Sequence, residues 1–425
     1  MAQIKPFKAL RYTKKAGAIE ALTCPPYDII SESQRQGYLK TNPNNMIRLE
    51  LPREGRDFYA TAGQTLREWE RGGILAQDSR DSFYIYEIEF AVKGQKDSVK
   101  GLICRVKLEE FSKEIILPHE ETLSKAKTDR FNLMKATNCN FSQIYSLYMD
   151  DGGVRNQLHG LSAGVPEIEM TDEQGLIHRL WTITDPEQTA QISARFEQKK
   201  LFIADGHHRY ETALNYRNWL REQGKAAPGD AADCVMMMLV DMENPGLHVF
   251  ATHRIVKNLA QFDPAVITEK CGKYFDITDK NGLSGMETEL EAQYNKHKKA
   301  FAFYCGGQSW KLMTLKAQFE QERFLSDKSP ATNGLDVTVL HTLVLENLFG
   351  IDRENMANGL NLAYTRDIAE ALAEVENGAA DCAFILNPTR VSEIREVSLA
   401  NEKMPQKSTY FYPKLITGLA MNKIR

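Results

Sequence analysis

The sequence predicts an α+β fold with mixed, largely antiparallel sheets. Residues 82–92 and 99–111 are rich in β-branched and aromatic side chains, and the polar link Lys93–Asp97 between them indicates a hairpin. A second apolar hairpin is expected over 300–315. Beyond residue 260, helical and strand-like patterns alternate, which indicates a mixed architecture rather than an all-helical one.

The remaining elements are predicted from periodicity and turn residues. The first 50 residues hold turn formers at Cys24–Asp28 and Asn42–Asn45 and are expected to form loops laid over another part of the protein. Residues 59–75 predict a helix because apolar side chains recur there at helical spacing. In chain order, we then expect a helix over 128–138, strands over 143–149 and 180–184, a helix from Pro186, a strand over 201–204, a helix ending near 224, strands over 234–242 and 247–256, helices near 264–274, 337–348 and 368–376, and a strand over 382–386.

The length of the chain and its net charge limit the architectures and partners that are expected. A chain of 425 residues suggests two or three lobes. We place the boundary after residue 258, giving a catalytic lobe over 1–258 and a C-terminal α/β lobe over 259–425, whose loop 404–414 is expected to return to the active site. The net charge is -4, so no basic excess favours nucleic acid as a partner. A small-molecule substrate and a nucleotide are the expected partners.

The location of the protein is expected to be cytoplasmic. No apolar run reaches the length of about 20 residues that a membrane helix needs, and the first residues lack an apolar signal segment. The seven cysteines are scattered without a Cys-x-x-Cys pair, which is typical of reduced, buried thiols. No membrane partner is therefore expected, and a homodimer remains open.

The segment Ala204–Arg209 is the strongest candidate for an active centre. A predicted strand ends at Asp205-Gly206, and a helix starts at once. The first turn of a helix carries unpaired N–H groups and partial positive charge, which together suit a phosphate group. His207, His208 and Arg209 add donors in that turn. Asp205 is a candidate to hold a metal ion or accept a proton, and the alternative is that it only caps the helix.

A second cluster follows the predicted strand that ends near residue 111. His119 and Glu120 are candidates for a general base, and Thr122 adds a hydroxyl group. Lys127 and Arg130 are candidates to pair with phosphates. The alternative is a solvated helix entry. No His-Glu-x-x-His pattern is present, so this is not a zinc-protease motif.

Three further motifs are weaker by themselves. They are Thr252-His253-Arg254, Gln406-Lys407-Ser408-Thr409-Tyr410, and Cys24-Pro25-Pro26-Tyr27-Asp28, and each is compatible with a structural role or a substrate contact. The sequence has no Walker-type phosphate loop, no Gly-x-Gly-x-x-Gly and no Gly-x-Ser-x-Gly.

Taken together, these motifs resemble a known bacterial family. The box Phe202–Ala213, with Asp205-Gly206-His207-His208-Arg209 at its centre, is similar to that of the family catalogued as domain of unknown function ten-fifteen. The resemblance runs nearly end to end. It also includes Pro26-Tyr27-Asp28, Asn42-Pro43, Pro118-His119-Glu120-x-Thr122, Lys127-x-Asp129-Arg130, Thr252-His253-Arg254 and the segment Met404–Lys414.

The same box resembles, more distantly, that of the free-serine kinases in the ParB/sulfiredoxin superfamily. In that superfamily a Gly-x-x-Arg turn at a helix N-terminus holds nucleotide phosphates, and the match covers Asp205 to Arg209 alone. The resemblance implies a ParB/sulfiredoxin-like nucleotide-binding core, here with large insertions. It also implies a catalytic glutamate before the box, for which Glu120 is our candidate by position.

Three hypotheses for function follow. The first is a phosphotransferase, a small-molecule kinase that moves phosphate from ATP or ADP, with Mg²⁺, to a hydroxyl such as that of free L-serine. The second is a phosphatase or other phosphoester hydrolase that uses the same pocket, and the third is a nucleotide-binding regulator without turnover. For the first we assign residues to roles as follows: Glu120, Asp205, His207 and His208 catalytic; Gly206, His207, His208, Arg209, Lys127 and Arg130 nucleotide-binding; Tyr27, Asp28, His119, Thr122, His253, Arg254 and Lys407 substrate-binding; and Asp205 metal-binding.

Overall fold

The chain forms two compact units in the computed structural model, which describes residues 1–122, 124–319 and 324–425. The first unit contains residues 1–118, 122–248 and 413–425. The second contains residues 119–121 and 249–412. The main part of the second unit is therefore inserted between His248 and Pro413 of the first.

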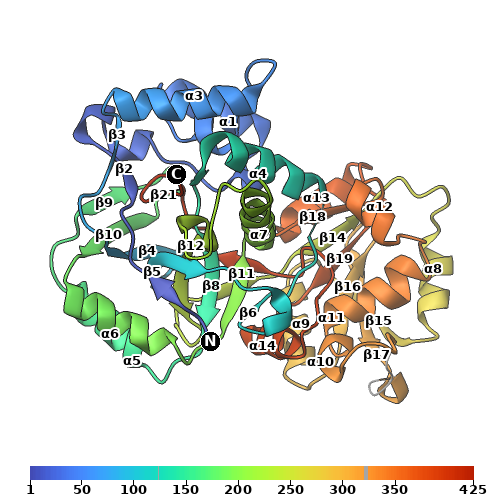
Figure 1. Ribbon diagram of the computed structural model, residues 1–425. Coiled ribbons are helices and arrows are strands. Elements are labelled where there is room, and N and C mark those ends of the chain that lie inside the picture. The colour runs from blue at the N-terminus through green and yellow to red at the C-terminus, as the bar shows by residue number, and fades with distance from the viewer. Residues whose placement is uncertain (123, 320–323) are drawn as a thin grey trace. The chain divides into compact units, whose positions relative to one another are not determined.

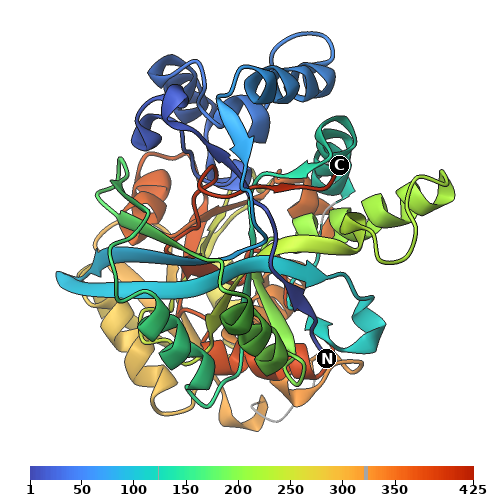
Figure 2. The ribbon, with the colours of Figure 1, turned by 60° about the vertical axis from the view of Figure 1, so that its left-hand side comes forward.

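A nine-stranded sheet forms the centre of the first unit in the part of the chain that the structure describes. Its order is β6 (Ile116–Leu117), β11 (Leu201–Asp205), β8 (Ile144–Tyr148), β12 (Cys234–Asp241), β5 (Gln95–Lys107), β4 (Phe83–Val92), β10 (Ile177–Ile183) and β9 (Ile168–Thr171), with β1 (Ile4–Lys5) beside β5. The pairs β11–β6 and β12–β8 are parallel, and the other pairings are antiparallel. Figure 2 shows the predicted β4–β5 hairpin as two long adjacent strands. The expectation of a mixed, largely antiparallel α+β fold is confirmed.

Helices pack against this sheet and on one another. They are α1 (Glu32–Thr41), α2 (Ile47–Glu50), α3 (Phe58–Arg71), α4 (Ser124–Thr137), α5 (Gly153–Leu161), α6 (Pro186–Phe196) and α7 (His207–Glu222). Helix α4 contacts both α3 and α7, as Figure 1 also shows. Because α7 follows β11 directly and packs on β8 and β12, the turn between β11 and α7 is fixed by the core of the sheet.

The two ends of the chain pair with each other inside the first unit. Strand β2 (Leu10–Tyr12) pairs with β3 (Leu75–Gln77), and β21 (Asn422–Lys423) pairs with β7 (Cys139–Asn140). Single bridges join Leu10 to Met421 and Cys24 to Thr417. The C-terminal segment therefore lies beside the N-terminal one, as Figure 2 shows in red and blue.

The second unit is built on a six-stranded sheet in which every pair is antiparallel, within the described residues. Its order is β15 (Phe275–Asn281), β17 (Ser309–Leu315), β16 (Ala300–Tyr304), β19 (Cys382–Leu386), β14 (His253–Val256) and β18 (Leu362–Thr365). Its helices are α8 (Pro264–Cys271), α9 (Met286–Tyr294), α10 (Pro330–Asn333), α11 (Asp336–Leu340), α12 (Arg353–Asn358), α13 (Ile368–Glu376) and α14 (Val391–Leu399), with a π-helical turn at His341–Glu346.

Three expectations about elements were wrong. The first 50 residues are not all loops, because Ser31 and Gln34 form a capping box that starts the polar helix α1, and α2 follows it. The expected strand 247–256 is two strands, β13 (His248–Phe250), which pairs with β20 (Tyr410–Tyr412), and β14. The helix expected over 59–75 ends at Arg71, since Gly72 and Gly73 stop it and Leu75 begins β3.

The length and hydropathy of the described helices bear on whether any of them could span a membrane. Within residues 1–122, 124–319 and 324–425, none is both long and apolar enough to span a bilayer.

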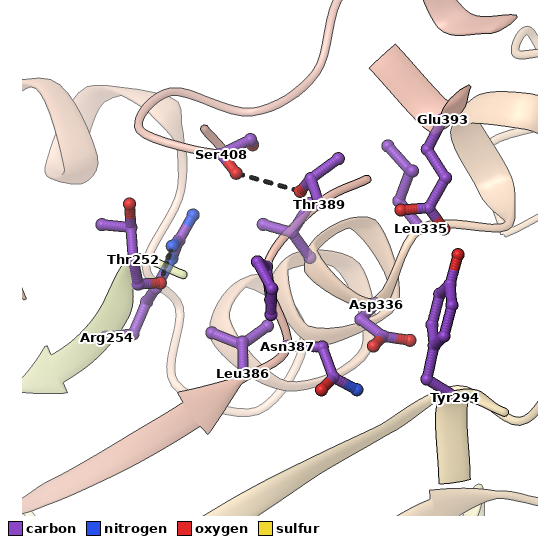
Figure 3. Close-up of a pocket in the computed structure, with 12 residues that line it drawn as sticks. Thr252, Arg254, Tyr294, Leu335, Asp336, Leu386, Asn387, Thr389, Glu393 and Ser408 are labelled. Carbon is purple, nitrogen blue, oxygen red and sulfur yellow. Dashed lines mark hydrogen bonds between the residues drawn. The ribbon is translucent and has the colours of Figure 1, made fainter. Parts of the chain in front are cut away.

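A buried carboxylate makes the stability of the second unit depend on pH. Asp336 begins α11 and lies close to Asn387 and Tyr294 (Figure 3). Burial raises the pKa of Asp336 to about 7, an effect that Lys299 opposes and Glu393 increases. The folded state therefore holds this proton more tightly than the unfolded state, whose pKa is about 4. We expect the free energy of unfolding to fall as pH rises from about 4 to about 7.

The substitution Asp336→Asn tests this expectation, because the amide stays neutral at every pH. Relative to the parent protein, the variant should gain stability between pH 5 and pH 8, on the order of 1–4 kcal/mol. Urea unfolding at both pH values measures the difference. Glu393, whose pKa is also raised by burial, contributes a slope of the same sign in both proteins. Parallel pH profiles for the two proteins would contradict the assignment.

Candidate functional site

The turn between β11 and α7 brings a glycine N-cap and an arginine side chain together. Gly206 is the N-cap of α7 with φ of 96°, a left-handed conformation that glycine adopts without strain. A Cβ atom at this position would lie 2.9 Å from Nε of Arg209, so the guanidinium folds back directly over the glycine. The alternative that Asp205 caps the helix is wrong, because the N-cap is Gly206 and Asp205 is the last residue of β11.

Asp205 and Arg209 form an ion pair at this turn. Nη2 of Arg209 donates to Oδ2 of Asp205 at 2.6 Å, and Nη1 donates to the carbonyl oxygen of Gln143 at 2.6 Å. Burial acts to lower the pKa of Arg209, but the charges of Asp205 and Asp28 outweigh it and the pKa is raised. The guanidinium is therefore a fixed cation beside the first turn of α7.

A second cation reaches Asp205 from the end of the chain. Nζ of Lys414 donates to Oδ1 of Asp205 at 2.5 Å, and the lysine side chain is only 11% exposed. Each carboxylate oxygen of Asp205 thus bonds a cation. The sequence analysis placed Lys414 within a motif but did not assign it to the site, since the contact joins residues 209 positions apart.

Glu50 is a buried carboxylate that the sequence analysis missed. It ends α2, is 2% exposed, and accepts a hydrogen bond from Oγ of Ser142 at 2.9 Å. Burial raises its pKa, although the charges of Arg130 and Arg209 act to lower it. A cavity of about 40 Å³ is lined by Glu50, Ser142, Arg130 and Arg209. The signal in the sequence was a lone acidic residue within the apolar run Met46–Leu51.

Arg130 connects Glu50 to the segment around Tyr27. Its Nη1 donates to the carbonyl oxygen of Glu50 at 2.6 Å, and its Nη2 donates to Oδ2 of Asp129 at 2.6 Å. The guanidinium lies 4.0 Å from the centre of the Tyr27 ring, a cation–π contact. Tyr27 and Asp28 form one 3₁₀ turn, and both act on the pKa of Arg209. Arg130, Tyr27 and Asp28 therefore gather with Arg209 within the first unit.

An acidic residue on α7, Glu211, binds the side chains of Thr122 and Lys127. Both donate to Oε2 of Glu211, Thr122 from Oγ1 at 2.9 Å and Lys127 from Nζ at 2.7 Å. Glu211 lies two residues beyond Arg209 in the helix and was not predicted as a site residue. Leu123, which belongs to the same predicted cluster, lies outside the described residues.

His119 and Glu120 belong to the second unit. The backbone N–H of Met404 donates to the carbonyl oxygen of His119 at 2.8 Å, and Nε2 of His119 lies 3.0 Å from Oγ1 of Thr409. Glu120 forms a parallel bridge with Met404. The segment that carries both candidate bases is thus held by residues 404–409, which include the exposed candidate Lys407.

His253 and Arg254 lie side by side in β14 but face different surroundings. Nδ1 of His253 accepts from the backbone N–H of Leu386 at 3.3 Å, and burial, then Arg254, lowers its pKa to about 4. Burial lowers the pKa of Arg254 to about 10, while the charges of Tyr364 and Glu120 act to raise it. His253 is therefore neutral at pH 7, and Arg254 is a buried cation.

The side chains around Asp205 are poorly suited to bind a metal ion. No group of three His, Cys, Asp or Glu side chains suited to a metal ion occurs among the residues that the structure describes. Both oxygens of Asp205 bond cations, so a Mg²⁺ ion there would compete with Arg209 and Lys414. The residues present do not fit a magnesium site, and no chemical step is assigned to one.

The family described as "Protein of unknown function (DUF1015)" matches residues 4–338. The chain belongs to this family. Among curated proteins, none matches the sequence of this chain.

Solved structures offer distant similarities. A conserved hypothetical protein from Pyrococcus furiosus is 14% identical, covers 75% of this chain and 95% of its own length, and has a TM-score of 0.36. A free serine kinase in complex with AMP is 14% identical and has a TM-score of 0.38, with coverage of 77% of this chain and 92% of that one. SbnI with C-terminal truncation from Staphylococcus aureus is 10% identical, with coverage of 76% and 87% and a TM-score of 0.37.

The buried charge of Glu50 leads to a testable expectation for stability. Glu50→Gln keeps the shape of the side chain but removes the negative charge that faces Arg130 and Arg209. Because burial outweighs the two arginines and raises the pKa of Glu50, the ionised side chain is destabilised in the folded state, and we expect Glu50→Gln to gain free energy of unfolding at pH 7, measured with urea. The exposed Glu20→Gln is the matched control and should change stability by less than about 0.5 kcal/mol. Equal stability of both variants, or a loss in Glu50→Gln, would show that the buried charge of Glu50 does not cost the folded state free energy.

Proposed function

We propose that this protein is a phosphotransferase, a small-molecule kinase that transfers phosphate from ATP or ADP to a hydroxyl group such as that of free L-serine. The observation that carries the proposal is the turn between β11 and α7. There a left-handed glycine begins a 16-residue helix, and the fixed guanidinium of Arg209 lies over that glycine. Helix dipole and guanidinium together favour a phosphate at this point.

The proposed nucleotide site uses the residues of this turn. Gly206 lets a phosphate approach the backbone, and His207, His208 and Arg209 supply donors from the first helical turn. Lys127 and Arg130 are proposed to add positive charge from α4. In the first unit, Tyr27, Asp28 and Thr122 are the proposed contacts to the acceptor. The acceptor class rests on the resemblance of the box to that of the free-serine kinases.

The proposed chemistry needs one base and no covalent intermediate on the protein. The acceptor hydroxyl oxygen attacks the terminal phosphorus of the nucleotide, and the bond from that phosphorus to the leaving nucleoside phosphate breaks. The hydroxyl proton passes to the carboxylate of Glu120. His119, His253, Arg254 and Lys407 are proposed to bind the acceptor, although the sheet contact of His253 also suits a purely structural role.

Phosphorus NMR can test the proposal directly. The protein is incubated with ATP or ADP, Mg²⁺ and a panel of hydroxy amino acids, and the phosphate signals are followed with time. Nucleotide-dependent formation of a phosphorylated amino acid is the expected result. Phosphate released from phosphoserine without nucleotide would instead indicate a hydrolase. Nucleotide binding without any phosphorylated acceptor would indicate a regulator.

A further inference from the structure

A cavity of about 150 Å³ lies in the second unit, beside the helical segment 336–346 and the loop 403–406. Leu325, Met356 and Met404 give it an apolar side. Thr338 and His341 line it as well, and both are almost fully buried, at 1% and 3% exposure. A cavity of this volume holds a molecule of about six non-hydrogen atoms.

The hydrogen bond from Arg254 fixes the tautomer of His341. Nε of Arg254 lies 3.2 Å from Nε2 of His341, and a guanidinium can only donate. Nε2 must therefore accept, so the ring proton is on Nδ1. Burial and then the charge of Arg254 lower the pKa of His341 far below its ordinary value, which keeps the ring neutral. His341 Nδ1–H is consequently an obligatory hydrogen-bond donor.

Two polar groups at this cavity have no hydrogen-bond partner among the residues that the structure describes. They are Nδ1 of His341 and Oγ1 of Thr338, and both are buried. An unpaired buried polar group is unfavourable, so two beside one cavity destabilise the folded state unless a bound molecule satisfies them. His341 also begins a π-helical turn, an irregular geometry that is frequent at functional sites.

The charges near the cavity favour an anionic group next to His341. The guanidinium of Arg254 donates to the ring and to the uncharged carbonyl oxygens of Thr252 and Gln406, and its positive charge polarises the Nδ1–H bond. Lys328 and Lys403 also line the cavity, and so do Glu121 and Glu346, so these four side chains balance in formal charge. Arg254, whose charge Glu120 partly offsets, adds a further positive charge behind the His341 ring.

We propose that this cavity binds a small monocarboxylate, whose carboxylate accepts hydrogen bonds from His341 Nδ1 and Thr338 Oγ1 and whose short carbon chain packs against Leu325 and Met356. The size of the cavity limits the ligand to the class of short hydroxy, keto or amino acids. Carboxylate binding here requires neither a nucleotide nor the β11–α7 turn, and it shares with the proposed phosphotransfer only Arg254, which orients His341.

Titration of the full-length protein without nucleotide tests the site. The probes are glycolate, L-lactate, L-serine and L-threonine, each paired with its neutral primary amide. Calorimetry measures affinity, and ¹⁵N-histidine NMR follows the Nδ1 signal of His341, which a His341→Gln variant identifies by its loss. We expect at least one carboxylate to bind with a Kd at or below about 1 mM, to shift the His341 signal, and to bind at least about tenfold more tightly than its amide.

Variants separate this cavity from any other binding place. Thr338→Val keeps the shape of the side chain and should weaken carboxylate binding about 2- to 10-fold, the effect of one hydrogen bond. Thr268→Val, the same change on a helix of this unit away from the cavity, should leave affinity unchanged. No carboxylate binding, equal affinity for amides, or unaltered affinity in Thr338→Val would each overturn the proposal. None of these outcomes would affect the phosphotransfer experiment, which has its own readout.

Discussion

Glu120→Gln is expected to lower turnover by about a hundredfold to ten-thousandfold, the range that a positioned general base contributes. The amide cannot accept the proton of the attacking hydroxyl, yet it keeps the size of the side chain. Nucleotide affinity should stay nearly constant, because Glu120 is not among the residues proposed to bind phosphate. Initial rates and calorimetric nucleotide binding, measured on the same preparation, separate the two effects.

The control for this change is an exposed glutamate close by in the sequence. Glu114→Gln should retain the rate of the parent protein. If Glu120→Gln also retained full turnover, the base would lie elsewhere, and His207 and His208 would be the next candidates. The bridge between Glu120 and Met404 is made by the backbone, so the substitution should leave the segment in place.

Replacement of Arg209 is expected to have the largest effect on nucleotide affinity. Loss of one charged hydrogen bond is worth roughly 1.5–3 kcal/mol, so affinity should fall at least about tenfold in Arg209→Ala. Arg209→Lys keeps the charge but cannot bond Asp205 and the carbonyl oxygen of Gln143 together, and it should also lose affinity. Calorimetric titration with ATP and ADP measures both variants.

Two measurements guard the interpretation of the Arg209 variants. Arg221→Lys, in the last turn of the same helix, should bind nucleotide like the parent protein. Circular dichroism must show that the Arg209 variants are folded, because Arg209→Ala removes one of the two cations that bond the partly buried Asp205. Unchanged nucleotide affinity in a folded Arg209→Ala protein would remove this residue from the proposed site.

Local patterns predicted the parts of the structure that depend on neighbouring residues. The apolar run before Asp205 and the helical pattern after Gly206 predicted β11 and α7, and the polar link 93–97 predicted the β4–β5 hairpin. Helix α1 was missed because most of its residues are polar and its signal is the capping box at Ser31. The break between β13 and β14 was missed because both halves have the residue types of a strand, and only their different partner strands separate them.

The site was predicted where it is local and missed where it is assembled from distant segments. The sequence located Gly206 and Arg209, but it did not indicate that Lys414 bonds Asp205. Glu50 and Ser142, 92 positions apart, also meet only through the tertiary fold. Periodicity and motif spacing carry no information about such pairs, because these contacts join segments that only the complete fold brings together.

The insertion of the second unit has a consequence for how this protein is made. Residues 413–425 complete the first unit: they supply the Lys414 bond to Asp205, the bridge from Met421 to Leu10 and the strand β21. A nascent chain on the ribosome therefore cannot finish the first unit until the whole second unit has been translated. Domains usually fold in order of synthesis, but here the order is partly reversed. Products of premature termination before residue 413 would lack Lys414, one of the two cations that bond Asp205, however well their inserted unit folds.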